Sequence, residues 1–192
     1  MPIIKVVDYS PTWPIAFEEL NNLYKEKLHG LYKAIEHVGS TSVPGLAAKP
    51  VLDIDIVVEA TADLTAIIQG LSSLGYYHIG DRGIPGREAF KRLDDSVPYA
   101  SGKKNWMEHH LYVCREGSAS LQNHLTLRNY LRSNPSAMNE YATLKRKLAQ
   151  AHPTNMNDYM EGKSAFIASI LIREGMTDTE VAAIIQQNKA SR

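Results

Sequence analysis

Two aspartates within one short apolar segment are the residues of this sequence best suited to do chemistry. Asp53 and Asp55 lie in the run Val-Leu-Asp-Ile-Asp-Ile-Val-Val at positions 51–58, where β-branched residues predict a strand that begins after Pro50. Because side chains alternate along a strand, both aspartates share one face, and the other face is purely apolar. Two carboxylates this close repel each other unless a proton, a basic group or a hard cation such as Mg²⁺ compensates them.

A polar turn precedes this strand by a short connection. It comprises Gly39, Ser40, Thr41 and Ser42, whose backbone N–H groups could bind a phosphate. Each motif has a simpler interpretation when taken alone, because such a turn is commonly a helix cap and an aspartate pair can mark an exposed strand edge. The combination of the two motifs in one compact unit favours a site that binds phosphate and metal.

Four basic residues are candidates for binding phosphate: Lys49, Arg92, Arg128 and Lys163. Arg92 and Arg87 both follow a loop rich in glycine, and loops of this kind often carry function. The alternative interpretation of this segment is an exposed basic strand face. Arg128 interrupts the apolar stripe of a predicted helix. Lys163 follows Tyr159 by four residues, so it lies near a buried helix face, where a lysine either pairs with an anion or extends its ammonium group to solvent.

The wording of the first motif is similar to that of a known family. The segment His-Val-Gly-Ser-Thr-Ser-Val-Pro-Gly-Leu-Ala-Ala-Lys-Pro at positions 37–50 resembles the GrpB family of the nucleotidyltransferase superfamily. The segments 110–113, 127–135, 141–145 and 159–163 resemble the same family, so the likeness extends from about residue 9 to residue 171. It implies a nucleotidyltransferase-like fold without specifying a reaction.

One position departs from the pattern of the superfamily. Active members usually carry a third carboxylate on the strand beside the Asp-x-Asp strand, and here His110 occupies that place. Glu108 lies on the same face and could contribute a carboxylate. Alternatively, His110 could bind metal or act as a base, since imidazole titrates near neutral pH. Tyr112 is a second departure, at a position where many family members carry histidine.

Length and charge limit the classes of function. The chain has 192 residues, of which 44% are hydrophobic, and 21 basic residues balance 21 acidic ones, so no long-range field favours nucleic acid. The single cysteine, Cys114, forms no internal disulfide, and no stretch approaches the roughly 20 apolar residues of a membrane span. We expect a cytoplasmic protein with no membrane partner and no signal peptide. Its oligomeric state is open.

The apolar patterns predict an α/β (α+β) fold with a mixed sheet packed by helices. Strands are expected at 3–7, 32–38, 51–58, 76–79 and 107–114. Helices are expected from Pro14 to just before Gly30, at 63–74 and at about 157–174, and three more are expected to begin near Ser118, Asn134 and Thr177. We expect one domain over residues 1–192, with a sheet-rich part at about 1–115 and a helical part at about 116–192.

The leading functional hypothesis is a metal-dependent nucleotidyltransferase acting on a nucleoside triphosphate and an unknown acceptor. Asp53 and Asp55 would hold Mg²⁺ or Mn²⁺, with His110 as a third catalytic candidate, and the glycine-serine turn and the basic residues would bind phosphate. The main alternative is a nucleotide-binding or regulatory module with a degenerate, catalytically weak site, which the missing third acid favours. A scaffold for protein contacts is a third possibility.

Overall fold

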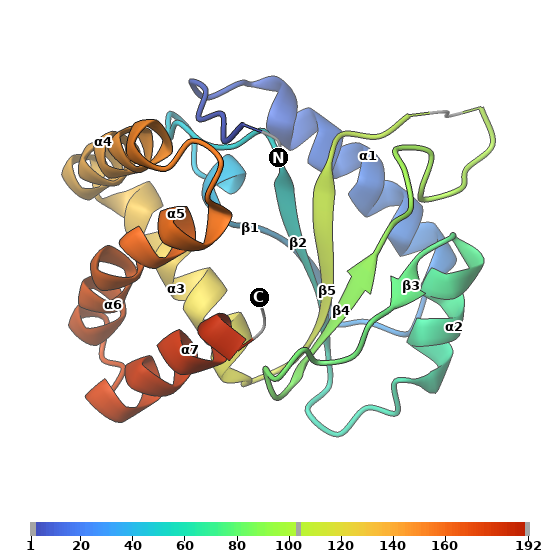
Figure 1. The fold of residues 1–192 in the computed structure, drawn as a ribbon. Coiled ribbons are helices and arrows are strands. Elements are labelled where there is room, and N and C mark those ends of the chain that lie inside the picture. Colours follow the sequence, from blue (N-terminus) through green and yellow to red (C-terminus); the bar gives the residue numbers. More distant parts are fainter. Residues whose placement is uncertain (1–2, 103–104, 191–192) are drawn as a thin grey trace.

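The computed structural model describes residues 3–102 and 105–190, which form a mixed sheet with helices on both faces (Figure 1). The sheet has five strands within the described residues: β1 (Ala34–Val38), β2 (Leu52–Val58), β3 (Tyr77–His78), β4 (Arg87–Lys91) and β5 (His109–Arg115). The helices are α1 (Thr12–Lys27), the 3₁₀ turn η1 (Ser40–Ser42), α2 (Thr65–Ser73), α3 (Ala119–Ser133), α4 (Pro135–Ala151), α5 (Met156–Gly162), α6 (Ser164–Arg173) and α7 (Asp178–Ala190). The predicted α/β class with a helical C-terminal part is confirmed.

The order of the strands places the Asp-x-Asp strand inside the sheet. The order is β1-β2-β5-β4-β3, and β2 pairs antiparallel with β1 but parallel with β5. Because β2 and β5 run in the same direction, their N-terminal ends lie at the same edge, and Asp53 stands directly beside His110.

The alternation of side chains along β2 divides the molecule into two layers. Leu52, Ile54 and Ile56 are fully buried in the main core, against α1 and α2. The aspartate face is directed toward the second layer, formed by α3 to α7, which packs into separate apolar clusters (Figure 1). The sheet therefore carries an apolar face and a face on which charged side chains meet a helical layer.

Local sequence signals explain several helix ends. The Ser118 hydroxyl accepts a hydrogen bond from the backbone N–H of Leu121 and caps α3, while Pro135 begins α4. The single helix expected at 157–174 is wrong, because α5 and α6 are separate helices that meet at Lys163. The break follows Gly162, a weak helix former that packs against Leu148 of α4, where an added Cβ would require the leucine side chain to shift.

The N-terminal segment differs from its expected strand. Residues 3–7 contribute only an isolated bridge between Val7 and Ala48. Within the part of the chain that the structure describes, no helix is long and apolar enough to cross a bilayer.

Candidate functional site

The Asp-x-Asp pair lies where the sheet faces the helical layer. Asp53 is the register partner of Val38 on β1 and His110 on β5, and Asp55 is the partner of Glu36 and Tyr112. The side chain of Asp53 is one-third exposed, whereas Asp55 is completely buried. The pair therefore extends from a solvent-accessible carboxylate to one enclosed by protein.

Each aspartate has its own histidine. His110 Nδ1 donates to Asp53 Oδ1 at 2.9 Å, and His124 Nδ1, from α3, donates to Asp55 Oδ2 at 2.7 Å. The hydrogen bond to Asp53 raises the pKa of His110. Burial alone would lower the pKa of His124, but the charge of Asp55 and the hydrogen bond to it raise it. The repulsion expected between the aspartates is thus offset by two imidazole rings.

The pKa of Asp53 follows from the same contacts. Burial favours its neutral form, yet the hydrogen bond from His110 and the positive charges of His110, His124 and Lys163 together lower its pKa. Asp53 therefore stays ionised at neutral pH.

The carboxylates retain capacity for a cation. Asp55 Oδ1 is buried and has no hydrogen-bond partner among the described residues. Carboxylate oxygens are the donors that Mg²⁺ and Mn²⁺ prefer, so this pair fits one hard cation. No group of three or more His, Cys, Asp or Glu side chains in the described ranges is arranged to hold a metal ion. The chain alone therefore does not form a complete cage, and a cation would need water or substrate oxygens as further ligands.

Gly39 allows the Asp53 carboxylate to approach the polar turn. Its φ is +68°, a left-handed value that favours glycine, and a Cβ at this position would lie 2.8 Å from Asp53 Cγ and closer still to Oδ2. Gly39 and Ser40 both line the pocket described below. The predicted proximity of turn and carboxylate is therefore present in the structure.

The rest of the turn is directed inward. The Thr41 hydroxyl lies 3.0 Å from His37 Nε2 and donates to Val51 O, and the Ser42 hydroxyl donates to Gly39 O at 2.7 Å. Both side chains are buried and neither lines the pocket. His37 stacks on Phe17, and burial lowers its pKa to about 4. These three residues hold the turn in shape.

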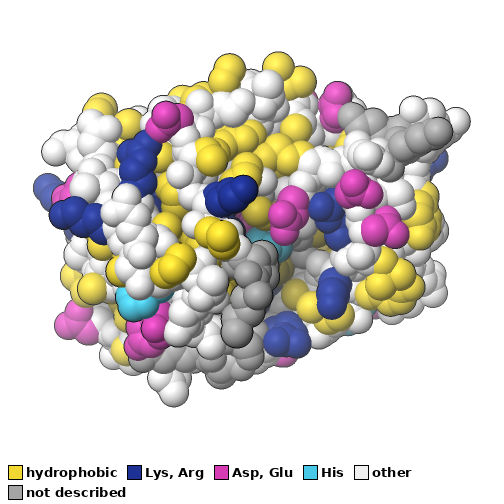
Figure 2. Space-filling view, turned by 45° about the horizontal axis from the view of Figure 1, so that its top comes forward, with side chains coloured by type: hydrophobic (Ala, Val, Ile, Leu, Met, Phe, Trp, Pro, Cys, Tyr) yellow, Lys and Arg dark blue, Asp and Glu magenta, His cyan; other side chains and the backbone are white. Residues whose placement is uncertain are grey.

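A pocket of about 920 Å³ separates the aspartate face from the helical layer. In Figure 2, basic and acidic side chains gather around this hollow, and a histidine is visible within it. Its described walls carry eight lysine or arginine residues against four aspartate or glutamate residues. This excess of positive charge favours an anionic ligand, although the chain as a whole is neutral.

Two lysines of the helical layer occupy equivalent local positions. Lys145 on α4 lies over the ring of Tyr141, and Lys163 lies over the ring of Tyr159, each with its Nζ 4.6 Å from the ring centroid. In both pairs the lysine follows the tyrosine by four residues, which places them on one helix face. Both lysines line the pocket.

Lys145 was not among the residues predicted for the site. It is only 2% exposed, and its Nζ has no hydrogen-bond partner among the described residues. Burial, together with the charges of Lys163 and Arg146, lowers its pKa to about 7. The available signal was its position four residues after Tyr141, the spacing that identified Lys163. His124 was also missed, and it lies four residues before Arg128 on the same helix.

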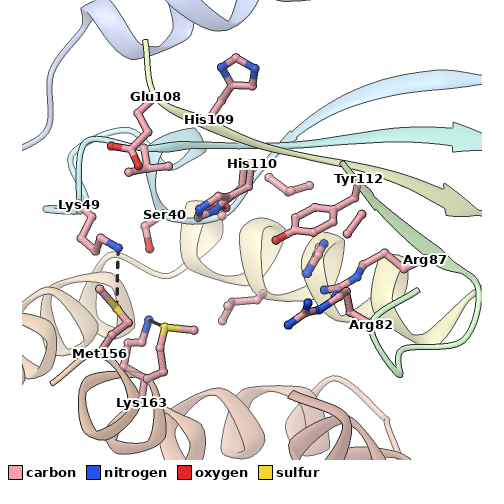
Figure 3. Close-up of a pocket in the computed structure, with 18 of the residues that line it drawn as sticks. Ser40, Lys49, Arg82, Arg87, Glu108, His109, His110, Tyr112, Met156 and Lys163 are labelled. Atoms are coloured by element: carbon pink, nitrogen blue, oxygen red, sulfur yellow. Dashed lines mark hydrogen bonds and ion pairs between the residues drawn. The ribbon is translucent and has the colours of Figure 1, made fainter. Parts of the chain in front are cut away.

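The predicted residues Lys49, Lys163 and Arg128 all line the pocket but make different contacts. Lys49 and Lys163 stand at one end of the pocket, with their ammonium groups beside Met156 and Met160 (Figure 3). Arg128 donates to Glu36 Oε2 at 2.6 Å and to a backbone carbonyl, so it connects α3 to β1 while lining the pocket.

Arg92 directly follows the last residue of β4. It lines the pocket, but its charge acts on Tyr24, Tyr76 and His109, which belong to the apolar face. The structure therefore does not bring Arg92 together with the aspartates. Arg87, the first residue of β4, does share the aspartate side of the sheet.

Comparison with known sequences identifies the family. The model of the GrpB protein family matches residues 3–173. The chain is 33% identical over 164 residues to UPF0157 protein YqkA of Bacillus subtilis, covering 85% of this chain and 45% of that protein. It is 30% identical over 167 residues to the glutamate-rich protein GrpB of Alkalihalophilus pseudofirmus, covering 86% of this chain and 92% of the relative. The chain thus spans less than half of the Bacillus subtilis relative.

Two solved structures share the fold. The crystal structure of conserved protein GrpB from Enterococcus faecalis has a TM-score of 0.73 and 33% identity, covering 96% of this chain and 99% of that one. The Cid1 poly(U) polymerase, solved with MgGTP bound, has a TM-score of 0.53 and 13% identity, covering 75% and 44% of the two chains. The second likeness concerns the fold alone. The chain belongs to the GrpB family and has a nucleotidyltransferase-like fold.

Proposed function

We propose that this chain is a metal-dependent nucleotidyltransferase that uses a nucleoside triphosphate and an acceptor of unknown identity. The observation that carries the proposal is the position of Asp53 and Asp55. They lie side by side on the face of the sheet that borders a basic pocket, with Asp53 against Gly39. An anionic ligand entering this pocket would meet basic side chains and the Asp53 carboxylate, with the buried Asp55 two residues along the same strand, and a metal–nucleotide complex has the matching charges.

The residues divide into two roles. Asp53 and Asp55 would hold Mg²⁺ or Mn²⁺, which, when bound, neutralises phosphate oxygens and polarises the phosphorus under attack. The Gly39–Ser40 backbone and Lys49, Lys145 and Lys163 would bind the triphosphate.

The proposed reaction is an in-line displacement at the α-phosphorus. A bond forms between an acceptor oxygen and the α-phosphorus, while the bond from the α-phosphorus to the bridging oxygen of the β-phosphate breaks. Pyrophosphate leaves with the bonding electron pair, and the acceptor proton passes to a base or to water. His110 touches Asp53 and is placed to act as that base in its neutral form.

A second candidate is a nucleotide-binding module that turns over slowly or not at all. The observation in its favour is that His110 stands at the register position beside Asp53 where a third carboxylate would lie, and that each aspartate already has a histidine partner. A histidinium in this place competes with a cation for the same carboxylate. Such a protein would report the presence of a nucleotide through its conformation.

Exchange of labelled pyrophosphate into nucleoside triphosphates separates the two candidates. The transferase should catalyse exchange that requires Mg²⁺ or Mn²⁺ and an acceptor-derived adduct, and the Asp53→Asn, Asp55→Asn double variant should show none. Equilibrium dialysis with each of the four ribonucleoside triphosphates measures binding in parallel. Binding without exchange, when a small-molecule cell extract supplies the acceptor, supports the module, and the absence of any metal-dependent binding refutes both candidates.

A further inference from the structure

Arg87 is a buried cation at the end of the pocket opposite the lysines. It is 8% exposed, and its Nε is buried without a hydrogen-bond partner among the described residues. No carboxylate lies within ion-pair distance of its guanidinium group in the described part of the chain. A buried guanidinium without an anion is costly, so a protein retains one where a ligand supplies the charge.

The guanidinium group of Arg87 lies against an aromatic ring. The group lies over the ring of Tyr112, with 4.5 Å from Cζ to the ring centroid, and the strand carrying it pairs antiparallel with β5. A guanidinium stacked on an aromatic ring keeps its N–H donors along its edge, where they can bind an oxyanion in a forked arrangement.

A second unpaired polar group lies on the facing helix. Asn123 precedes His124 on α3, lines the same pocket and is 9% exposed, and its Oδ1 has no hydrogen-bond partner among the described residues. Arg87 is close enough to His124 for its charge to act on that ring. The end of the pocket near β4 and α3 therefore presents two buried polar side chains that the protein itself leaves incompletely satisfied.

The two basic ends of the pocket lie on opposite sides of the aspartate row. In Figure 3, Lys49 and Lys163 stand at one side, Arg82 and Arg87 at the other, and His110 and Tyr112 lie between them. A triphosphate bound by the lysines would leave the arginine end unfilled. In a transfer reaction, the acceptor approaches the α-phosphorus from the side opposite the leaving pyrophosphate.

We propose that Arg87 forms a second anion subsite, which binds a phosphate or carboxylate group of the acceptor substrate. The assignment to an acceptor rests on the proposed transferase function, whereas the anion subsite itself does not. It follows that the acceptor is an anionic molecule whose reacting hydroxyl lies near Asp53 when its oxyanion is held by Arg87.

Calorimetric titration with inorganic phosphate and, separately, with acetate tests the subsite. Each anion is titrated into the protein alone and into protein saturated with Mg²⁺ and a non-hydrolysable nucleoside triphosphate. We expect phosphate or acetate to bind in both states, and Arg87→Met, which keeps an apolar stem over Tyr112, to weaken that binding at least tenfold. Arg87-dependent binding of phosphate assigns a phosphoryl group, and Arg87-dependent binding of acetate alone assigns a carboxylate.

Arg173→Met is the matched control. Arg173 also lies over a tyrosine ring, that of Tyr130, but it is exposed and outside this pocket. Its loss should leave anion binding unchanged. Arg87→Lys should restore part of the affinity if positive charge is the cause, which distinguishes a lost subsite from a damaged fold.

Failure of the anion subsite and failure of the transferase function give different results. Equal anion binding by the unmodified protein and Arg87→Met overturns the subsite, whatever the nucleotide does. Failure of every nucleotide to bind, with anion binding still dependent on Arg87, overturns the transferase function and leaves the subsite standing.

Discussion

Replacing Lys145 with methionine should stabilise the protein without ligand. The pKa of Lys145 falls from 10.5 to about 7 in the folded state, a difference of about 3.5 units. At about 1.4 kcal/mol per unit, the charged form of this lysine costs the folded protein on the order of 5 kcal/mol. Methionine keeps the length of the stem but loses the contact of the ammonium group with the Tyr141 ring, worth about 1 to 2 kcal/mol. We therefore expect a net gain of about 3 kcal/mol at pH 7.

The pKa of Lys145 in the folded and the unfolded protein determines how the unfolding free energy changes with pH. Below pH 7 Lys145 is protonated in both the folded and the unfolded protein, so the folded protein bears the full free-energy cost of burying the charged ammonium group. Between pH 7 and 10.5 the unfolded chain binds a proton that the folded chain does not, so the stability of the unmodified protein rises with pH. The difference in unfolding free energy between the two proteins should therefore shrink by about 2 to 3 kcal/mol from pH 7 to pH 9.

Urea unfolding at pH 6.5, 7, 8 and 9 measures this difference directly. Lys147→Met on the same helix is the control, because Lys147 is exposed and lies outside the pocket, and its removal should change stability little at any of these pH values. If the proposed function is right, a metal–nucleotide complex should raise the melting temperature, and Lys145→Met should lose most of that rise. A variant that is less stable than the unmodified protein, with parallel pH profiles, would refute the interpretation of Lys145 as a strained, ligand-binding cation.

Three further predictions concern neighbouring residues. Gly39→Ala should lower the unfolding free energy by more than about 1 kcal/mol and weaken metal-dependent nucleotide binding, because its Cβ would collide with the Asp53 carboxylate; unchanged urea unfolding would contradict the geometry. The unmodified protein should lose up to about 3 kcal/mol through His109 as the pH falls from 6.5 to 4, because burial lowers its pKa to about 4, and His109→Gln should lose less when urea midpoints at pH 7 and 4.5 are compared. His110→Asp should increase the affinity for Mn²⁺ measured by calorimetry, since it places a third carboxylate beside Asp53, and an equal or weaker affinity would count against that assignment.

The local parts of the fold were predictable because they depend on neighbouring residues. The β-branched run 51–58 and its alternation identified β2 and its aspartate face, and Ser118 identified the start of α3. The break between α5 and α6 was missed, because the apolar spacing continues from Tyr159 to Phe166 and does not reveal the turn at Lys163. The single-domain organisation and the cytoplasmic location stay predictions.

The contact between Gly39 and Asp53 was predictable from the sequence, whereas the residues that reach the site from the helical layer were not. Asp53 and Gly39 come together as expected, since they flank one short connection. Thr41 turns inward because its hydroxyl finds buried partners, which residue type alone does not indicate. His124 and Lys145 reach the site from distant helices, and a contact between residues far apart in the sequence follows from tertiary packing rather than from periodicity.

The parallel register of β2 and β5 bears on how chemistry can arise or disappear in this lineage. His110 is the direct neighbour of Asp53 across the sheet, and its side chain is half exposed. A histidine codon becomes an aspartate codon through a change of its first base. A single point mutation can therefore place or remove a third acid here while the backbone stays as it is. Ancestral reconstruction can recover the order of such exchanges among relatives with otherwise similar sequences.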